Sequence, residues 1–337
     1  MNYERARGLM QVLLNHYGLR EQPFAMTSDP KFLYLGSGHR ESLASLVYSI
    51  AAGRGFVALV AETGMGKTTL LFNLLRQLQG YAETAFLFQT QFNPREFMQY
   101  LLIELGHKMA NQDLVLAYED FNKNLVRNAR AGKKTVIVID EAQNLDIPVL
   151  ETVRLLSNFE TPKNKLLHIV MAGQPRLADK LSDPSLVQLR QRISVIAHLS
   201  PLSPEETCSY IAHRLRVAGY EGVPLFAPGA LAMIAAHSKG IPRNINNLCF
   251  AALSIAYALG KRTVDANIVE EAAADFDLSR VVSQQCADSY PSAEAVEFAG
   301  TYLRAFKAAM GGAAQSRGPG SKNRVPNEIT MGDWATV

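Results

Sequence analysis

The sequence predicts an α/β domain built on a parallel sheet covered by helices, followed by a small domain made only of helices. Two observations lead to this prediction. Short apolar segments alternate with helical segments up to Leu199, and only helical periodicity follows. Parallel strands need crossover connections, and the crossover helices bury both faces of the sheet.

The elements of the first 200 residues can be assigned in order. After an N-terminal helix comes an irregular stretch with Pro23, Pro30, Gly36 and Gly38, and a second helix begins near His39. The predicted strands are the apolar segments 56–60, 85–88, 135–139, 166–172 and 193–199. The predicted helices between them are 67–78, 94–108, 121–130 and 148–159.

Residues 201–278 are predicted to form the helical domain. Ser203 and Glu206 make a capping box with Pro204 at the first helical position, so a helix begins there. Helical periodicity then covers 204–217, 228–238, 242–259 and 265–275. The last part, 279–337, predicts a polar linker, one amphipathic helix at 294–310 and a mobile tail.

Composition excludes several classes of protein. The 337 residues include 34 Lys and Arg against 31 Asp and Glu, a net charge of +3 that is too mild for a strongly cationic nucleic-acid binder. The three cysteines lie far apart, with no zinc-type spacing, which argues against a disulfide scaffold or a zinc site. Because no apolar run approaches roughly 18 residues and no signal peptide is evident, we expect a cytoplasmic protein without a membrane span.

The most informative segment is the turn between strand 56–60 and helix 67–78. Gly64 and Gly66 allow successive main-chain N–H groups to point at phosphate oxygens, with a helix N-terminus behind them. Lys67 is predicted to reach the β- and γ-phosphates of ATP, and the Thr68 hydroxyl to bind Mg²⁺. Ala61 stands where the motif G-x-x-x-x-G-K-[ST] has its first glycine, and a plain strand-ending turn is the alternative. The candidate nucleotide-binding residues are Glu62, Thr63, Gly64, Met65, Gly66, Lys67, Thr68 and Thr69.

Two carboxylates follow the apolar strand 135–139 directly. Asp140 suits a contact to Mg²⁺, and Glu141 suits orienting and deprotonating the attacking water. Alone, two acids after a strand also fit an ordinary solvated loop. The phosphate-type turn upstream favours the catalytic interpretation.

Together these residues resemble an AAA+ ATPase, and further segments resemble the ExeA/GspA-type ATPases of the general secretion pathway. The resemblance covers about residues 15–277, and the same clade contains the TnsC/TniB-type transposition ATPases. It implies a P-loop NTPase core over 1–200 with an N-terminal adenine-pocket segment, and a helical lid over 201–278. The segments that carry it include Tyr17-Gly18-Leu19, Gln22-Pro23-Phe24, Asp140-Glu141-Ala142-Gln143-Asn144-Leu145, Gly173-Gln174-Pro175, Leu189-Arg190-Gln191-Arg192-Ile193 and Gly240-Ile241-Pro242-Arg243.

The resemblance implies roles for four more polar residues. Gln174 stands where such proteins place a sensor of the γ-phosphate or the attacking water, although a strand-ending Gln also fits a turn. Arg192, favoured over Arg190, is implied as the arginine finger for a neighbouring subunit, although either also fits a surface cation. Arg243 resembles the second sensor of the lid, since a merely solvated cation would oppose the helix dipole there.

The adenine pocket is expected near Phe24, Tyr34, His39 and Arg40. The alternative is that both aromatic residues belong to the core and that His39 only begins a helix.

The predicted function is ATP hydrolysis coupled to homo-oligomerisation, as a ring or filament, and to contact with a protein partner in a secretion- or envelope-associated role. Two alternatives remain: a DNA-binding ATPase regulator of transposition, and an assembly switch with little turnover. Residues 121–134 contain no acidic side chain, and their basic side chains could contact the phosphate backbone of duplex DNA. Cations near a helix C-terminus also form ordinary solvated faces. The basic residues of this stretch are Lys123, Arg127, Arg130, Lys133 and Lys134.

Overall fold

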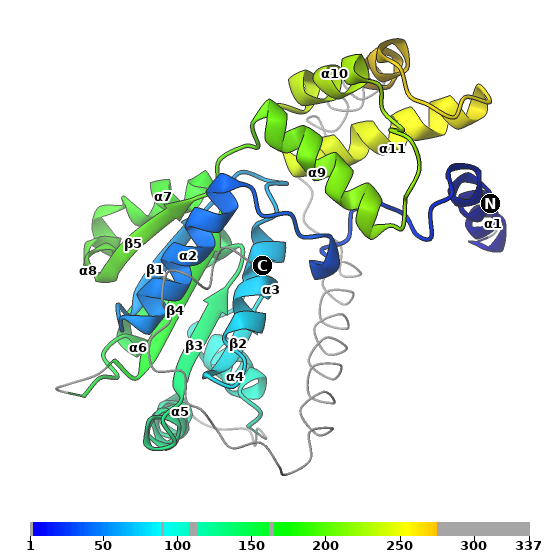
Figure 1. Cartoon of the computed structure of the whole chain (residues 1–337). Coiled ribbons are helices and arrows are strands. Elements are labelled where there is room, and N and C mark those ends of the chain that lie inside the picture. The colour runs from blue at the N-terminus through cyan, green and yellow to red at the C-terminus, as the bar shows by residue number, and fades with distance from the viewer. Residues whose placement is uncertain (1–2, 89–90, 108–113, 162–164, 275–337) are drawn as a thin grey trace. The chain divides into compact units, whose positions relative to one another are not determined.

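The computed structural model describes residues 3–88, 91–107, 114–161 and 165–274 (Figure 1). These residues belong to one compact unit that spans Met1–Ala287. The predicted linker, the helix at 294–310 and the predicted mobile tail lie outside the described residues. No helix in the described ranges combines the length and the apolar character that a membrane crossing requires.

A five-stranded sheet forms the centre of the first part, and all of its strand pairs are parallel. The strand order is β2-β3-β4-β1-β5. Every residue of β1 and β4 is buried, which explains why both sequences are apolar apart from His168 of β4. The strands are β1 Phe56–Val60, β2 Ala82–Leu87, β3 Lys134–Ile139, β4 Leu167–Gly173 and β5 Ile193–His198.

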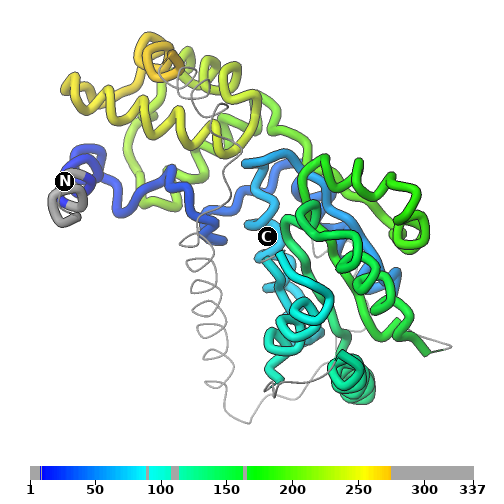
Figure 2. Tube along the Cα trace, turned by 180° about the vertical axis from the view of Figure 1, so that it is seen from behind, coloured from blue at the N-terminus to red at the C-terminus, as the bar shows by residue number. Residues whose placement is uncertain are grey.

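Helices cover both faces of this sheet (Figures 1 and 2). On one face lie α2 Ser37–Ala51 and α3 Lys67–Gln77, where Phe72 of α3 packs on Phe86 of β2. Helices α4 to α8 bury the other face in one continuous apolar core. They are α4 Pro94–Glu104, α5 Leu114–Arg130, α6 Ile147–Leu156, α7 Pro175–Leu181 and α8 Val187–Arg192.

The predicted parallel sheet and flanking helices are therefore confirmed, with shifted boundaries. Strand β2 begins at Ala82 rather than at 85, because its first three residues are only half-buried at the sheet edge and include Glu83 and Thr84. Helix α5 begins at Leu114 rather than at 121, and exposed Val115 and Leu116 weaken the helical pattern of its first turn.

A second apolar core lies among the helices that follow β5. The predicted capping box is present: Ser203 Oγ accepts from the Glu206 N–H at 3.1 Å, and the Glu206 carboxylate accepts from the Ser203 N–H at 3.1 Å. Residues 266–274 are also helical. The helices are α9 Pro204–Val217, α10 Pro228–Ser238 and α11 Pro242–Ala258.

The N-terminal segment packs into this second core. Helix α1 Tyr3–Tyr17 and the following residues, including the short helix η1 Pro30–Phe32, supply buried side chains to it. Tyr17 Oη donates to Leu253 O of α11 at 2.9 Å. The sequence predicts that residues 1–200 form one domain. Contacts between the N-terminal segment and helices more than 180 positions later leave no local pattern in the sequence, so this packing could not be predicted. The apolar side chains involved are Leu13, Leu14, Tyr17, Leu19, Phe24 and Phe32.

Candidate nucleotide-binding and hydrolysis site

The turn after β1 has the backbone geometry of a phosphate loop. Gly64 and Gly66 both have φ of 85°, in the left-handed region that glycine adopts without strain. A Cβ added at Gly64 would lie 2.7 Å from the Cβ of Arg243. Ala61 has a negative φ, and its N–H donates to Gly173 O at 3.0 Å, so alanine fits the first position of the loop.

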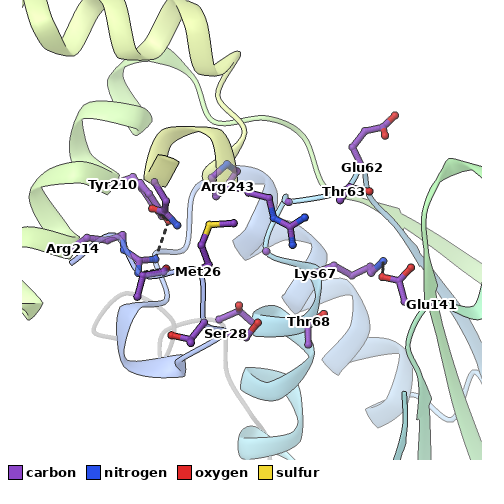
Figure 3. Close-up of a pocket in the computed structure, with 17 residues that line it drawn as sticks. Met26, Ser28, Glu62, Thr63, Lys67, Thr68, Glu141, Tyr210, Arg214 and Arg243 are labelled. Atoms are coloured by element: carbon purple, nitrogen blue, oxygen red, sulfur yellow. Dashed lines mark hydrogen bonds and ion pairs between the residues drawn. The ribbon is translucent and has the colours of Figure 1, made fainter. Parts of the chain in front are cut away.

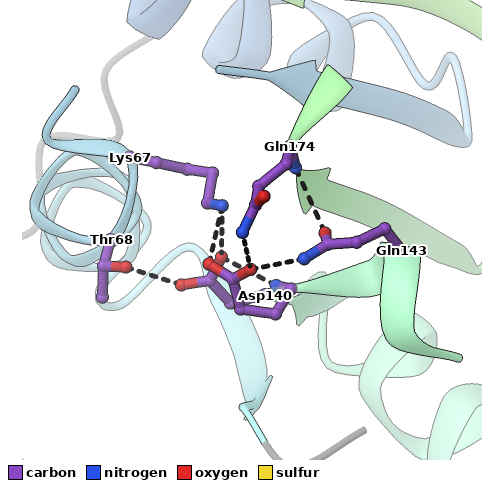
Figure 4. A network of polar contacts seen from close by, with 6 residues as sticks. Lys67, Thr68, Asp140, Gln143 and Gln174 are labelled. Atoms are coloured by element: carbon purple, nitrogen blue, oxygen red, sulfur yellow. Dashed lines mark hydrogen bonds and ion pairs between the residues drawn. The ribbon is translucent and has the colours of Figure 1, made fainter. Parts of the chain in front are cut away.

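Four side chains from two elements meet beside this loop (Figure 4). Lys67 and Thr68 begin α3, and Asp140 and Glu141 follow β3. Lys67 Nζ lies 2.8 Å from Glu141 Oε1 and 3.7 Å from Asp140 Oδ1. Thr68 Oγ1 donates to Asp140 Oδ2 at 2.7 Å. The structure thus brings these predicted site residues together at the carboxyl edge of the sheet.

The backbone at Glu141 is unusual. Its φ of 50° places a non-glycine residue in the left-handed region, a conformation that the surrounding structure must stabilise. The Glu141 N–H donates to Asp140 Oδ1 at 2.9 Å. This local bond accompanies a sharp turn that brings both carboxylates to the Lys67 ammonium.

The two acids differ in burial and in pKa. Burial raises the pKa of Asp140, against the opposing charge of Lys67 and the Thr68 hydrogen bond. Burial alone would raise the pKa of Glu141 as well. The Lys67 ammonium and two side-chain amides outweigh that effect and hold its pKa below the usual range. Glu141 is therefore ionised at neutral pH.

Two glutamine side chains contact Glu141 from the side opposite Lys67. Gln174, directly after β4, donates from Nε2 to Glu141 Oε2 at 3.3 Å. Gln143, in the short helix η2 Ala142–Asn144, donates to the same oxygen at 2.5 Å. For Gln174 the sequence carried only the role that the resemblance to AAA+ ATPases implied, a sensor of the γ-phosphate or the attacking water. It assigned no role to Gln143, whose position depends on the turn made by Glu141.

A pocket opens from these residues toward the helical part (Figure 3). One wall is the phosphate loop with Lys67, Thr68 and Glu141. The opposite wall consists of the N-terminal residues 25–28 and side chains of α9 and α11. The helical residues that line the pocket are Tyr210, Arg214, Pro242, Arg243 and Asn246.

Arg243 brings the helical part directly onto the phosphate loop. It lies in the first turn of α11, its side chain lines the pocket, and its N–H donates to Gly64 O at 3.1 Å. This position agrees with a residue that contacts phosphate from the lid, and its sensor role remains a prediction.

Arg214 is a buried cation that sequence reasoning missed. It is 5% exposed and pairs with no carboxylate in the described part of the chain. Its guanidinium donates to the Tyr210 hydroxyl at 3.0 Å and to the main-chain oxygens of Pro23 and Ala25, and it stacks over the ring of Phe32. The local sequence carries no signal for this role, because the partners Pro23 and Ala25 lie about 190 positions away. Arg214 ties the N-terminal wall of the pocket to α9.

None of the four residues predicted for the adenine pocket is among the described residues that line this pocket. Phe24 is buried in the helical core against Phe226, and Tyr34 packs on Tyr210 and His213. The structure agrees with the alternative that both are core aromatics. Arg40 donates to Leu35 O.

His39 supports the phosphate loop from behind. It is 3% exposed, and its Nε2 lies 2.9 Å from Met65 O, an oxygen that accepts the N–H. Burial lowers the pKa of His39, so the ring is neutral and this hydrogen bond persists at neutral pH.

The remaining predicted residues lie away from the pocket. Arg190 and Arg192 of α8 donate to Ser182 O at 3.4 Å and Asn158 Oδ1 at 3.0 Å. Within a single chain, their role as a finger for a neighbouring subunit stays a prediction.

Two of the basic residues proposed to face DNA have acidic neighbours, one three residues away in the sequence and one on β2. Lys123 lies 3.0 Å from Asp120, and Arg127 lies 3.9 Å from Glu83. Lys134 donates to Ala51 O at 2.8 Å and so caps the end of α2. Arg130 and Lys133 are exposed.

A parallel sheet of this order, with a phosphate loop after β1, paired acids after β3 and a helical region beyond β5, defines the AAA+ class of P-loop proteins. Residues 50–181 match the family model described as the AAA domain. The chain is 41% identical over 249 residues to general secretion pathway protein A of Aeromonas hydrophila, which confirms the resemblance to that type. The match covers 74% of this chain and 45% of that protein, so the chain spans less than half the length of this relative.

Solved structures show the same fold at low sequence identity. The Drosophila ORC bound to DNA matches with a TM-score of 0.57 and 19% identity, over 79% of this chain and 65% of that chain. The Aeropyrum pernix ORC2 protein, in ADPNP–ADP complexes, matches with a TM-score of 0.55 and 14% identity, over 75% and 71% of the two chains. At such identities the likeness concerns the fold alone.

Proposed function

We propose that this protein binds ATP with Mg²⁺, hydrolyses it, and couples its nucleotide state to self-association and partner contact. The observation that carries the proposal is the cluster of Lys67, Thr68, Asp140 and Glu141 beside a glycine-shaped phosphate loop. Each residue has the chemistry that phosphoryl transfer to water requires: an ammonium for phosphate oxygens, oxygen ligands for a hard cation, and a carboxylate base.

The cluster fits Mg²⁺. The Thr68 hydroxyl and the Asp140 carboxylate are hard oxygen donors in direct contact at 2.7 Å, and Mg²⁺ is usually held by one or two protein oxygens together with substrate phosphates. Thr68 and Asp140 would hold the ion, which would neutralise charge on the β- and γ-phosphates. Burial raises the pKa of Asp140, and a divalent cation held there would oppose that shift.

Glu141 is the group we assign to the attacking water. Lys67 now occupies its Oε1 at 2.8 Å. When Lys67 turns to the phosphate oxygens of ATP, that carboxylate oxygen is released to accept the water proton. The water oxygen then bonds to the γ-phosphorus, the bond to the ADP oxygen breaks, and ADP and phosphate leave.

Coupling to conformation rests on the two-sided pocket. Arg243 and Arg214 reach it from the helical part, and Lys67 and Glu141 from the sheet edge. A nucleotide between them would contact both sides, so its hydrolysis would change the contacts between them. We assign Arg192, or else Arg190, to the nucleotide of a neighbouring copy, which would make turnover dependent on association.

The biological role we favour is secretion- or envelope-associated, with the site in the cytoplasm. Its support is the 41% identity to general secretion pathway protein A. The alternative role, a DNA-bound ATPase regulator of transposition, is supported by the exposed Arg130 and Lys133. A nucleotide-dependent assembly switch would bind ATP with negligible turnover.

Steady-state ATP hydrolysis tests these alternatives in one experiment. Wild type, Lys67→Ala and, as a matched control, the exposed Lys261→Ala are assayed with and without duplex DNA across a salt series. We expect turnover in wild type and Lys261→Ala and none in Lys67→Ala. Stimulation by DNA that weakens with salt supports the DNA-bound role, whereas binding without turnover in wild type contradicts hydrolysis and supports the switch.

A further inference from the structure

Gln143 joins two residues of the site through one side-chain amide (Figure 4). Its Nε2 donates to Glu141 Oε2 at 2.5 Å, and its Oε1 accepts from the Gln174 N–H at 3.1 Å. The amide therefore connects the ends of β3 and β4, the two strands that deliver Glu141 and Gln174.

The orientation of this amide is determined by its neighbours. A carboxylate oxygen can only accept a hydrogen bond, and a main-chain N–H can only donate one. A flipped amide would place NH₂ against N–H and oxygen against carboxylate, so both bonds would be lost. Gln143 is thus held with its donor on Glu141.

The backbone of Gln143 is also held in place. Lys180 of α7 donates to Gln143 O at 3.0 Å and to Leu145 O, which fixes both sides of η2. Gly173 ends β4 next to the amide: a Cβ added there would lie 2.6 Å from Gln143 Oε1. A side chain larger than hydrogen at position 173 would displace the amide.

We propose that Gln143 is the positioning residue for the catalytic carboxylate: it fixes Oε2 of Glu141 so that Oε1 faces the attacking water once Lys67 has turned to phosphate. The inference rests on the proposed hydrolysis by Glu141. Gln143 touches neither water nor nucleotide in this scheme, and it acts only through the carboxylate that it orients.

One consequence distinguishes positioning from a merely structural role. Loss of Gln143 should lower kcat while leaving KM for ATP near the wild-type value, because the phosphate-binding residues are untouched.

The test compares Gln143→Ala and Gln143→Glu with wild type and with Asn144→Ala, a change at an exposed residue of the same turn. We expect kcat to fall about 10–100-fold for Gln143→Ala. Gln143→Glu should also lower kcat, because it replaces the amide donor with a like charge beside Glu141. Asn144→Ala should match wild type in kcat and KM.

The outcomes separate this inference from the proposed function. Turnover in wild type with an unchanged kcat in both Gln143 variants overturns the inference alone. No turnover in folded wild type overturns both. A rise in KM that matches the fall in kcat/KM would make Gln143 a binding residue and would also contradict the positioning role.

Gly173→Ala moves the amide without changing its chemistry. We expect kcat to fall in this variant, and the loss in the double variant with Gln143→Ala to be smaller than the sum of the single losses. Both changes act on the contact at Gln143 Oε1, although the added Cβ would also lie 2.9 Å from Leu177 Cδ2. Additive losses in the double variant, measured on protein with a cooperative thermal transition, would contradict the proposal.

Discussion

The two walls of the pocket differ in how they are encoded. The wall at the sheet edge consists of residues from short motifs, because Lys67 and Thr68 adjoin the loop that they serve and Asp140 adjoins Glu141. The opposite wall is assembled from residues 25–28 together with residues of α9 and α11 that lie between 182 and 221 positions further along the chain. The residues at the sheet edge can therefore be recognised from short sequence motifs. The residues of the opposite wall come together only when the N-terminal segment packs against the helices that follow β5.

The largest expected effect is the loss of ATP turnover when a residue of the sheet-edge wall is changed. Glu141→Gln removes the base but keeps the size of the side chain, so turnover should fall by about 10²–10⁴-fold while ATP still binds. Hydrolysis and fluorescent-nucleotide binding measured on the same preparation check this. Normal turnover in the variant would reassign the base, and loss of binding would make Glu141 part of the phosphate site instead.

The sheet itself should respond to acid through His168. Burial, with a smaller contribution from the Lys134 charge, lowers the pKa of this β4 residue from 6.5 to about 4. As the pH falls through this window, the unfolded chain takes up a proton and the folded chain does not. Stability should therefore drop by about 3 kcal/mol between pH 6.5 and 4 on this account and level off below it.

Urea unfolding of wild type and His168→Leu as a function of pH measures that effect. Neither ring nitrogen of His168 has a hydrogen-bond partner in the described structure. Replacing His168 by leucine therefore removes the titratable imidazole without breaking a hydrogen bond. The variant should show a flatter pH dependence across the same window. An unchanged slope would mean that other groups cause the acid sensitivity.

On the opposite wall, formed by residues 25–28, α9 and α11, we expect loss of Arg214 to lower both the stability of the protein and its affinity for ATP. Arg214→Ala leaves Pro23 O and Ala25 O without their donor and should cost about 1–3 kcal/mol of unfolding free energy. Because residues 25–28 line the pocket, KM for ATP should rise more than kcat falls. Arg216→Ala on the same helix is the control, and an equal effect in both variants would count against a specific role for Arg214.

The smallest expected effect is on stability and concerns the two capping boxes, at the start of α4 and at the start of α9. Asn93→Ala at α4 and Ser203→Ala at α9 should each cost about 1 kcal/mol. Glu206 of the second box also accepts from the Ser37 N–H at the start of α2, whereas Glu96 serves its own box. Glu206→Ala should therefore destabilise more than Glu96→Ala in thermal unfolding, and equal losses would remove this link between the two regions.

The sequence predicted the sheet, the lid helices and the cluster at the sheet edge because each leaves a local trace. Short apolar runs mark buried strands, and a glycine pair before Lys67 marks a loop that only glycine can form. Gln143, Arg214 and residues 25–28 leave no such trace. The role of Gln143 depends on the left-handed turn at Glu141, and Arg214 looks like any helical cation until Pro23 and Ala25 pack against it.

The most direct test of the account is calorimetric titration of Mg–ATP into wild type and into Lys67→Ala, each verified as folded by its thermal transition. The account predicts saturable binding by wild type that is lost or strongly weakened when the Lys67 ammonium is removed. Equal affinity in the two proteins, or no binding by folded wild type, would contradict a phosphate site at the turn after β1.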